Sequence, residues 1–122
     1  MKITNVMIEQ AYNNGKKVYS GKIGWNEAKY AINTASGMDI GSAQAYINVF
    51  IAMINGEEYR RTINTFATGY YLANIKSDFG IEVLKKAVTA VDLHTKYYKT
   101  LGKGSLVSIE NIVRVYKEKY SL

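Results

Sequence analysis

The absence of proline constrains the fold of this sequence more than any other feature. Its 122 residues contain no proline and ten glycines. Proline is the strongest helix breaker, because it lacks an amide hydrogen and its ring clashes with the preceding turn. Without it, apolar residues at helical spacing can form uninterrupted helices whose ends are marked by glycine. We therefore expect an all-α fold, a compact bundle of about six helices in a single domain, residues 1–122.

Apolar residues at helical spacing predict where the helices lie. We expect helices at about residues 4–19, 25–35, 42–54, 65–79 and 81–98, and a sixth from residue 105 or 108 to about residue 120. The expected N-caps are Thr4, Ser42 and either Ser105 or Ser108, and Gly37 should end the second helix in the left-handed conformation. The third helix is apolar almost all round, which predicts that Phe50 is deeply buried. In the fourth, we expect Phe66, Ala67, Tyr70 and Ala73 to face inward, with Tyr71 as a further candidate. Residues 57–64 lack this periodicity and should form an irregular or weakly extended connection.

Composition excludes several classes of function. The chain has no cysteine, so it has no disulfide, no thiolate nucleophile and no cysteine zinc site. It has one histidine, His94, which cannot supply a multi-histidine metal site and more often packs as a hydrogen-bonded residue than acts as a catalyst. No apolar run reaches the ~18 residues that span a membrane, and no signal-peptide core follows Met1. We expect a cytoplasmic protein without membrane contact, catalytic residue, metal or cofactor.

The strongest local signal lies between residues 56 and 64. Two of the three arginines of the chain are adjacent here, and arginine suits bidentate contact with phosphate or guanine. The residues that we expect to contact DNA in this segment are Tyr59, Arg60, Arg61, Thr62 and Asn64. Adjacent residues of an extended segment point to opposite sides, so only one arginine should face DNA while the other pairs with an acid or packs inward. The alternative is a solvated turn in which both arginines pair with Glu57 and Glu58.

A second signal is a helix, a short turn with glycine and another helix over residues 25–54. This is the outline of a helix-turn-helix, in which the start of the second helix meets base edges. Here that start offers Ser42 and Gln44, with Asn48 one turn later, and Gln and Asn side chains can read adenine. An ordinary helical hairpin is the alternative.

The distribution of charge is a third signal. The chain has a net charge of +6. Residues 1–36 carry five lysines against two acids, residues 99–122 carry five basic residues against two acids, and the middle is neutral. Basic ends around a neutral middle fit contact with a phosphate backbone. The alternative is a lysine-rich surface that only keeps the protein in solution.

The order of several short motifs resembles the N-terminal helical region that precedes HNH nuclease domains in some bacterial restriction-type endonucleases. The motifs are Gly37-Met38, Gly41-Ser42-Ala43, Tyr46-Ile47, Phe50, Met53, Gly56, Tyr59-x-Arg61-Thr62-Ile63-Asn64, Tyr71-Leu72, Gly80, and His94 with Tyr97-Tyr98. The resemblance implies a role in DNA recognition with cleavage supplied by another domain, and it favours Arg61 as the arginine that faces DNA. It transfers no catalytic residue, because an HNH site needs more than one histidine. The chain would then be an excised domain or a stand-alone relative.

Two hypotheses of function follow. The first is a non-catalytic recognition module for duplex DNA, with modified bases among its targets, related to restriction and defence endonucleases. A homodimer and a fused or partner nuclease domain are the protein partners that it allows. The second is a helical protein-interaction or dimerisation module of a defence or phage system, which predicts exposed apolar surface left over from the core.

Overall fold

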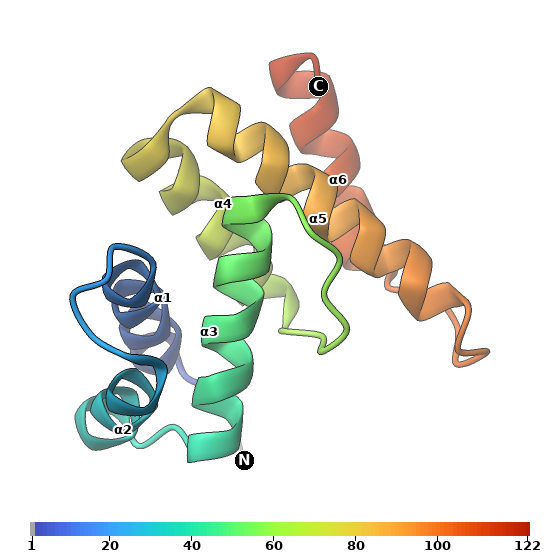
Figure 1. The fold of residues 1–122 in the computed structure, drawn as a ribbon. Coiled ribbons are helices and arrows are strands. Elements are labelled where there is room, and N and C mark those ends of the chain that lie inside the picture. Colours follow the sequence, from blue (N-terminus) through green and yellow to red (C-terminus); the bar gives the residue numbers. More distant parts are fainter. Residues whose placement is uncertain (1) are drawn as a thin grey trace. The chain divides into compact units, whose positions relative to one another are not determined.

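The computed structural model describes residues 2–122, and within them the chain forms six α-helices and no strand (Figure 1). The helices are α1 (Asn5–Tyr19), α2 (Trp25–Ser36), α3 (Ile40–Asn55), α4 (Thr65–Phe79), α5 (Ile81–Lys99) and α6 (Val107–Tyr120). The all-α prediction is confirmed. Contacts gather into two compact units, one ending at Ile51 and the other comprising Ala52–Leu122. The expectation of a single domain stays a prediction.

In the first unit, α1 and α2 form a hairpin of packed helices with the expected caps. Thr4 caps α1, since its hydroxyl accepts a hydrogen bond of 3.3 Å from the Met7 amide. Gly37 ends α2 with a φ of 79°, a left-handed conformation that glycine adopts without steric cost. Both predicted helix ends are confirmed.

The start of α3 differs from the prediction. The expected N-cap, Ser42, lies inside the helix, which begins at Ile40. The Asp39 carboxylate accepts hydrogen bonds from the Ser42 amide at 2.8 Å and from the Ser42 hydroxyl at 2.9 Å. The backbone carbonyl oxygen of Asp39 accepts a hydrogen bond of 2.9 Å from the Ala43 amide. Asp39 therefore caps the helix, and the turn between α2 and α3 shortens to three residues, Gly37, Met38 and Asp39.

Phe50 lies at the centre of the core of the first unit and has no exposed surface, as predicted. Its ring meets the ring of Tyr12 edge-on, with centroids 5.2 Å apart. Gly15 of α1 lies directly against the same ring, because a Cβ atom at this position would be 2.9 Å from Phe50 Cδ2. The glycine thus lets α1 approach Phe50 more closely than any other residue type could.

In the second unit, α5 packs against both α4 and α6. α4 and α6 run parallel, because Thr65 shares a hollow with the first residues of α6, and Lys76 Nζ lies 5.4 Å from the ring centroid of Tyr120. Two of the four residues expected to face inward from α4 are instead exposed, Phe66 and Ala73, and Tyr71 is buried. The helix is apolar on two sides, and the further candidate, Tyr71, lies one turn after Ala67 on the buried side.

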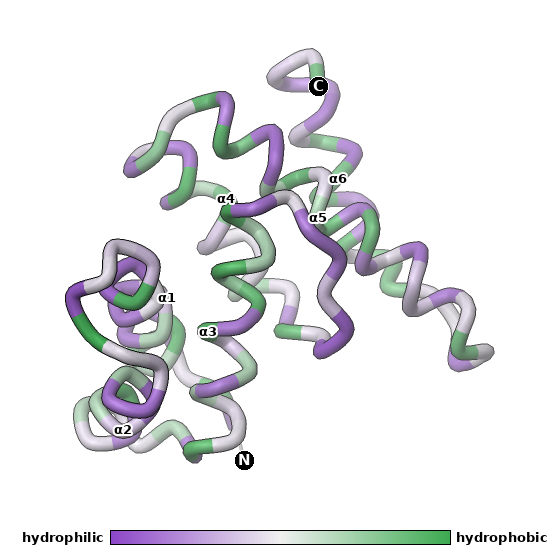
Figure 2. The backbone as a smooth tube through the Cα atoms, in the orientation of Figure 1, coloured by the Kyte–Doolittle hydropathy of each residue, from purple (hydrophilic) through white to green (hydrophobic). Residues whose placement is uncertain are grey.

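The predictions for the start of α6 and for the connection before α4 are confirmed only in part. Neither Ser105 nor Ser108 caps α6; the capping position is Leu106, which makes no side-chain cap bond. Residues 57–64 form neither helix nor strand, as expected. Figure 2 shows most of this connection, between α3 and α4, as hydrophilic.

Candidate nucleic-acid interface

His94 of α5 holds the connection between α3 and α4 in place. Its Nδ1 lies 2.7 Å from the carbonyl oxygen of Tyr59, and its Nε2 lies 2.8 Å from the hydroxyl oxygen of Thr62. A carbonyl can only accept, so Nδ1 carries the proton of the neutral ring, and Nε2 accepts from the Thr62 hydroxyl. We call these two hydrogen bonds the His94 pin. They fix both ends of the short segment that carries the two arginines.

Stacking and burial reinforce the pin. The rings of Tyr59 and His94 are nearly parallel, 15° apart, with centroids separated by 4.4 Å. Burial lowers the pKa of His94, against smaller opposing effects of the hydrogen bond to Tyr59 and of the charge on Glu58. Burial likewise raises the pKa of the Tyr59 hydroxyl. Both groups are therefore neutral at pH 7 and stabilise the connection without a buried charge.

Tyr59 does not face a partner on the surface, contrary to the expectation that it contacts DNA. Its side chain is buried against His94, so a base could stack on it only after the connection opened. The chain places an aromatic residue here to anchor the connection. Nothing near Tyr59 in the sequence indicates this role, because the ring that covers it lies 35 residues further along the chain.

The two arginines have different surroundings: Arg60 pairs with an acid, as expected of one of them, and Arg61 does not. Which of them faces DNA stays a prediction. Arg60 Nε lies 3.6 Å from a Glu58 carboxylate oxygen, and its guanidinium lies 4.8 Å from the centroid of the Tyr97 ring. The Arg60 side chain is nevertheless 73% exposed. Arg61 is exposed and has no hydrogen bond, ion pair or ring contact within residues 2–122. Its guanidinium is available to a ligand without breaking an existing contact.

The two short polar residues of the connection already have structural partners. The Thr62 hydroxyl is used in the His94 pin. Asn64 is the N-cap of α4, and its Oδ1 accepts a hydrogen bond of 2.7 Å from the Ala67 amide. Both residues lie at the exposed surface. We had assigned both to DNA contact, but their oxygens act first in shaping the connection.

The other candidate residues, on α3, belong to the first unit and are described separately. Gln44 and Asn48 are both exposed and lie one turn apart. Gln44 Oε1 accepts a hydrogen bond of 3.3 Å from Lys29 Nζ of α2. The Ser42 hydroxyl donates to Asp39 and is half-buried. Gln44 and Asn48 remain at the surface for contact with a partner, whereas Ser42 is part of the start of the helix.

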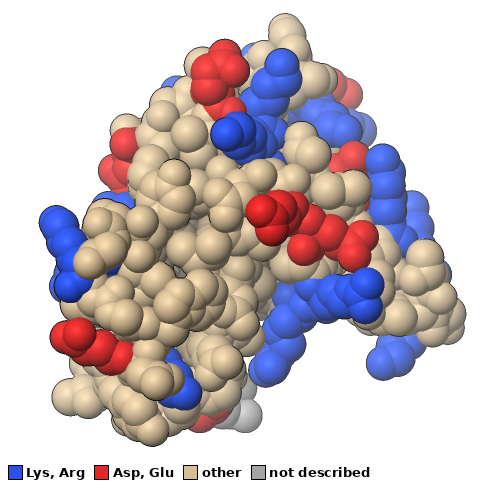
Figure 3. All heavy atoms as spheres, viewed as in Figure 1, with Lys and Arg blue, Asp and Glu red and all other residues tan. Residues whose placement is uncertain are grey.

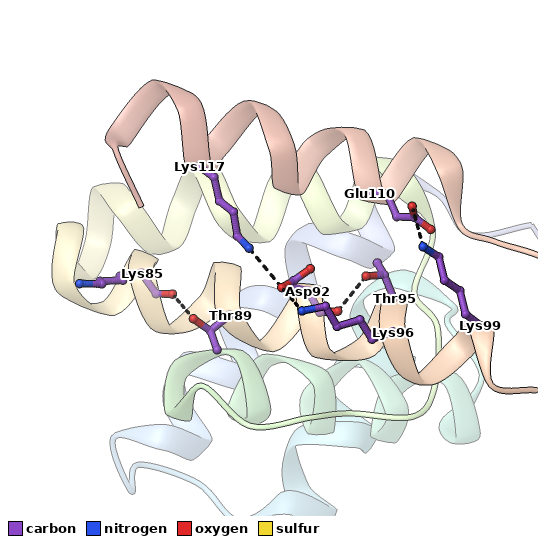
Figure 4. Close-up of polar contacts among 8 residues, drawn as sticks. All are labelled: Lys85, Thr89, Asp92, Thr95, Lys96, Lys99, Glu110 and Lys117. Carbon is purple, nitrogen blue, oxygen red and sulfur yellow. Dashed lines mark hydrogen bonds and ion pairs between the residues drawn. The ribbon is translucent and has the colours of Figure 1, made fainter.

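The cations near the C-terminal end are less available than the sequence suggests. A groove of about 430 Å³ lies between α5 and α6, and ion pairs line it (Figure 4). Asp92 Oδ2 lies 3.0 Å from Lys96 Nζ and 3.1 Å from Lys117 Nζ. Further pairs join Lys99 to Glu110 and Arg114 to Glu118. Four basic side chains of this region therefore compensate acids of the same chain.

These ion pairs also affect the ionisation of Asp92. Partial burial acts to raise its pKa, but the hydrogen bonds and the positive charges of Lys96 and Lys117 together outweigh this effect, and the pKa lies below its ordinary value. On the face that Figure 3 shows, acidic side chains lie among the basic ones.

Within residues 2–122, no group of three His, Asp or Glu side chains is arranged so that it could hold a metal ion. None of the described helices is both long enough and apolar enough to cross a membrane. Comparisons with protein-family models, with curated proteins and with solved structures returned no match.

Proposed function

We propose that this chain is a non-catalytic module that binds duplex DNA. The observation that carries the proposal is the pinned connection, which presents Arg61 without a partner and Arg60 as a largely exposed neighbour. Because the His94 pin already fixes the backbone of the connection, the backbone loses less conformational entropy when a ligand binds. The pin therefore favours recognition. The net charge of +6 supports the same conclusion, because contact with phosphate dominates affinity for DNA.

In this proposal the residues have separate roles. Arg61 contacts a base edge or a phosphate directly, and Arg60 contributes charge from its place over Tyr97. His94, Tyr59 and Thr62 position the two arginines. Gln44 and Asn48 offer amide groups that could read bases from α3, and the resemblance to the region ahead of HNH nuclease domains is a further, sequence-based reason to expect recognition of this kind.

Duplex binding measured by fluorescence anisotropy at several salt concentrations tests the proposal. We expect affinity to fall with salt, with a log–log slope of about −0.9 for each phosphate contacted. Arg61→Ala should weaken binding by about 1–3 kcal/mol if Arg61 reads a base. Arg114→Ala removes the same charge from α6 and is the matched control, expected to have a smaller effect. Binding that is absent at low salt, or that does not depend on salt, would overturn the proposal.

Sequence preference separates the roles of the two elements. Gln44→Ala and Asn48→Ala should change the ratio of affinities for different duplexes if α3 enters a groove. A variant that loses only a phosphate contact should weaken binding to all duplexes equally. If Arg61→Ala, Gln44→Ala and Asn48→Ala all bind specific and random duplexes like the parent, these side chains form no DNA-binding face.

One observation favours the alternative, a protein-interaction module. Val107 is 62% exposed and Phe66 is 55% exposed. Val107 lines the hollow where the N-termini of α4 and α6 meet, and Phe66 directly follows Thr65, which lines it too. Exposed apolar side chains that lie together often mark a protein interface. Sedimentation of the parent and of a Phe66→Ser, Val107→Ser variant tests this: a parent dimer that the variant loses would support the alternative, and a monomeric parent would exclude self-association through this surface.

A further inference from the structure

A second basic site lies at the first half of α5, away from the ion pairs of the α5–α6 groove. It is a hollow of about 310 Å³. The residues that line it come from the end of α3 and from α5: Asn55, Gly56, Glu82, Lys85, Lys86 and Thr89. Gly56 turns the chain at the end of α3 with a φ of 71°, and a Cβ atom on it would lie 3.3 Å from Lys86 Cβ. The backbone therefore approaches Lys86 closely at the floor of the hollow.

The lysines of this hollow are unpaired. Within residues 2–122, neither Lys85 nor Lys86 lies within ion-pair distance of an acid, although both are exposed. Glu82 is the one acid among the described residues that line the hollow, and it forms no ion pair with them. Figure 4 shows the Lys85 side chain pointing away from Asp92. These two cations differ in this respect from Lys96 and Lys117, which share one carboxylate.

The pinned connection begins directly after Gly56, which lines the hollow. The connection follows one stripe of α5, since Gly56 lies at Lys86, Tyr59 and Thr62 bond to His94, and Arg60 lies over Tyr97. Lys86, His94 and Tyr97 are spaced by eight and three residues, which places them on the same side of a helix. Unpaired cations therefore occur at both ends of this stripe, Lys85 and Lys86 at one end and Arg61 at the other, where Arg60 pairs with Glu58.

We infer that this hollow binds one backbone phosphate of duplex DNA, as a second anchor beside the arginines; the inference rests on the proposed function. Lysine ammonium groups and the Asn55 amide are donors suited to phosphate oxygens. Lys86 and Tyr97 are eleven residues apart on α5, which corresponds to about 16 Å at the rise of 1.5 Å per residue. At 3.4 Å per base pair, a duplex that lies along α5 would meet the two anchors about five base pairs apart.

The salt dependence of duplex binding tests this inference. The parent is compared with a Lys85→Gln, Lys86→Gln variant and with a Lys76→Gln, Lys119→Gln control that loses the same charge from α4 and α6. We expect the slope of the log–log plot to fall in magnitude by about 0.9 in the first variant, the contribution of one phosphate, and to stay unchanged in the control. A Lys85→Arg, Lys86→Arg variant, which keeps the charge, should keep the slope of the parent.

The outcomes separate this inference from the proposed function. If the parent does not bind duplex DNA, the proposed function fails. If the parent binds and the Lys85→Gln, Lys86→Gln variant keeps its slope, only the phosphate site is refuted. Equal losses of slope in this variant and in the control would also refute the site, because the effect would then follow from net charge alone. Circular dichroism of each variant verifies that the exposed substitutions leave the helices intact.

Discussion

The pH dependence of stability tests the His94 pin most directly. Below its pKa the His94 ring carries a charge that must be buried against Tyr59, so burial lowers the pKa in the folded protein below the ordinary value near 6.5. As pH falls, the unfolded chain takes up this proton first. The free energy of unfolding contributed by the pin is therefore complete above about pH 6.5 and is lost as pH falls from there toward the folded-state pKa.

One proton sets the size of this effect. Between the two pKa values the unfolded chain holds up to one proton more than the folded chain, so the free energy of unfolding falls by at most about 1.4 kcal/mol for each pH unit. Asp92 also has a lowered pKa, but its contribution is lost only below its ordinary value of 3.8, in a separate window. Loss of stability between pH 5 and 6.5 can thus be assigned to His94.

Urea unfolding followed by circular dichroism at pH 5 to 8 measures the effect. His94→Gln keeps hydrogen-bonding groups but does not titrate, so its stability should be flat over the window in which the parent loses stability. Because His94 is the single histidine of the chain, its proton NMR signal reports the folded-state pKa without ambiguity. Matching pH profiles for parent and His94→Gln, or a folded-state pKa at or above 6.5, would refute the role that we assign to burial.

Substitutions at three further positions test the packing and the caps by urea unfolding. Phe50→Ala should cost about 3–5 kcal/mol, because it empties a fully buried site, and a loss under about 1 kcal/mol would mean that Phe50 is not central to the core. Gly15→Ala should destabilise the chain, because the new methyl group would lie 2.9 Å from the Phe50 ring. This cost should exceed the higher helix propensity of alanine, which is about 1 kcal/mol relative to glycine. A variant more stable than the parent would show that the ring moves freely. Asn64→Ala should cost about 1 kcal/mol by removing the cap of α4, while Asn64→Asp, which can also cap, should cost less, and equal losses would contradict the capping role.

The positions of the helices could be predicted because they depend on local pattern. The ranges 65–79 and 25–35 were predicted to within one residue, and Gly37 ended its helix as expected. The errors occurred where two local signals competed. Asp39 and Ser42 are both good caps, and the structure uses Asp39. On α4, both the stripe with Phe66 and the stripe with Tyr71 are apolar, so periodicity alone could not choose the buried one.

The candidate site was less predictable because its contacts are distant in sequence. The adjacent arginines and their acidic neighbours were visible, and so was the different pairing of the two arginines. The partner of Thr62 was not visible, because His94 lies 32 residues away. Net charge was also misleading near the C-terminus, where Lys117 and Lys96 both serve Asp92. Pairing of this kind depends on how α5 and α6 pack, and the composition carries no information about that packing.

The sequence separation of the His94 pin has a consequence for the order of folding. The packing of α1 with α2, of α4 with α5 and of α5 with α6 joins neighbours in the chain, whereas the pin joins groups 32 and 35 residues apart. Contacts between near neighbours form early, because closing a short loop loses less entropy. We expect the pin to close after the helices have packed, so that losing it speeds unfolding and leaves the folding rate nearly unchanged. The arginine-bearing connection would then be the last segment to settle and the first to open.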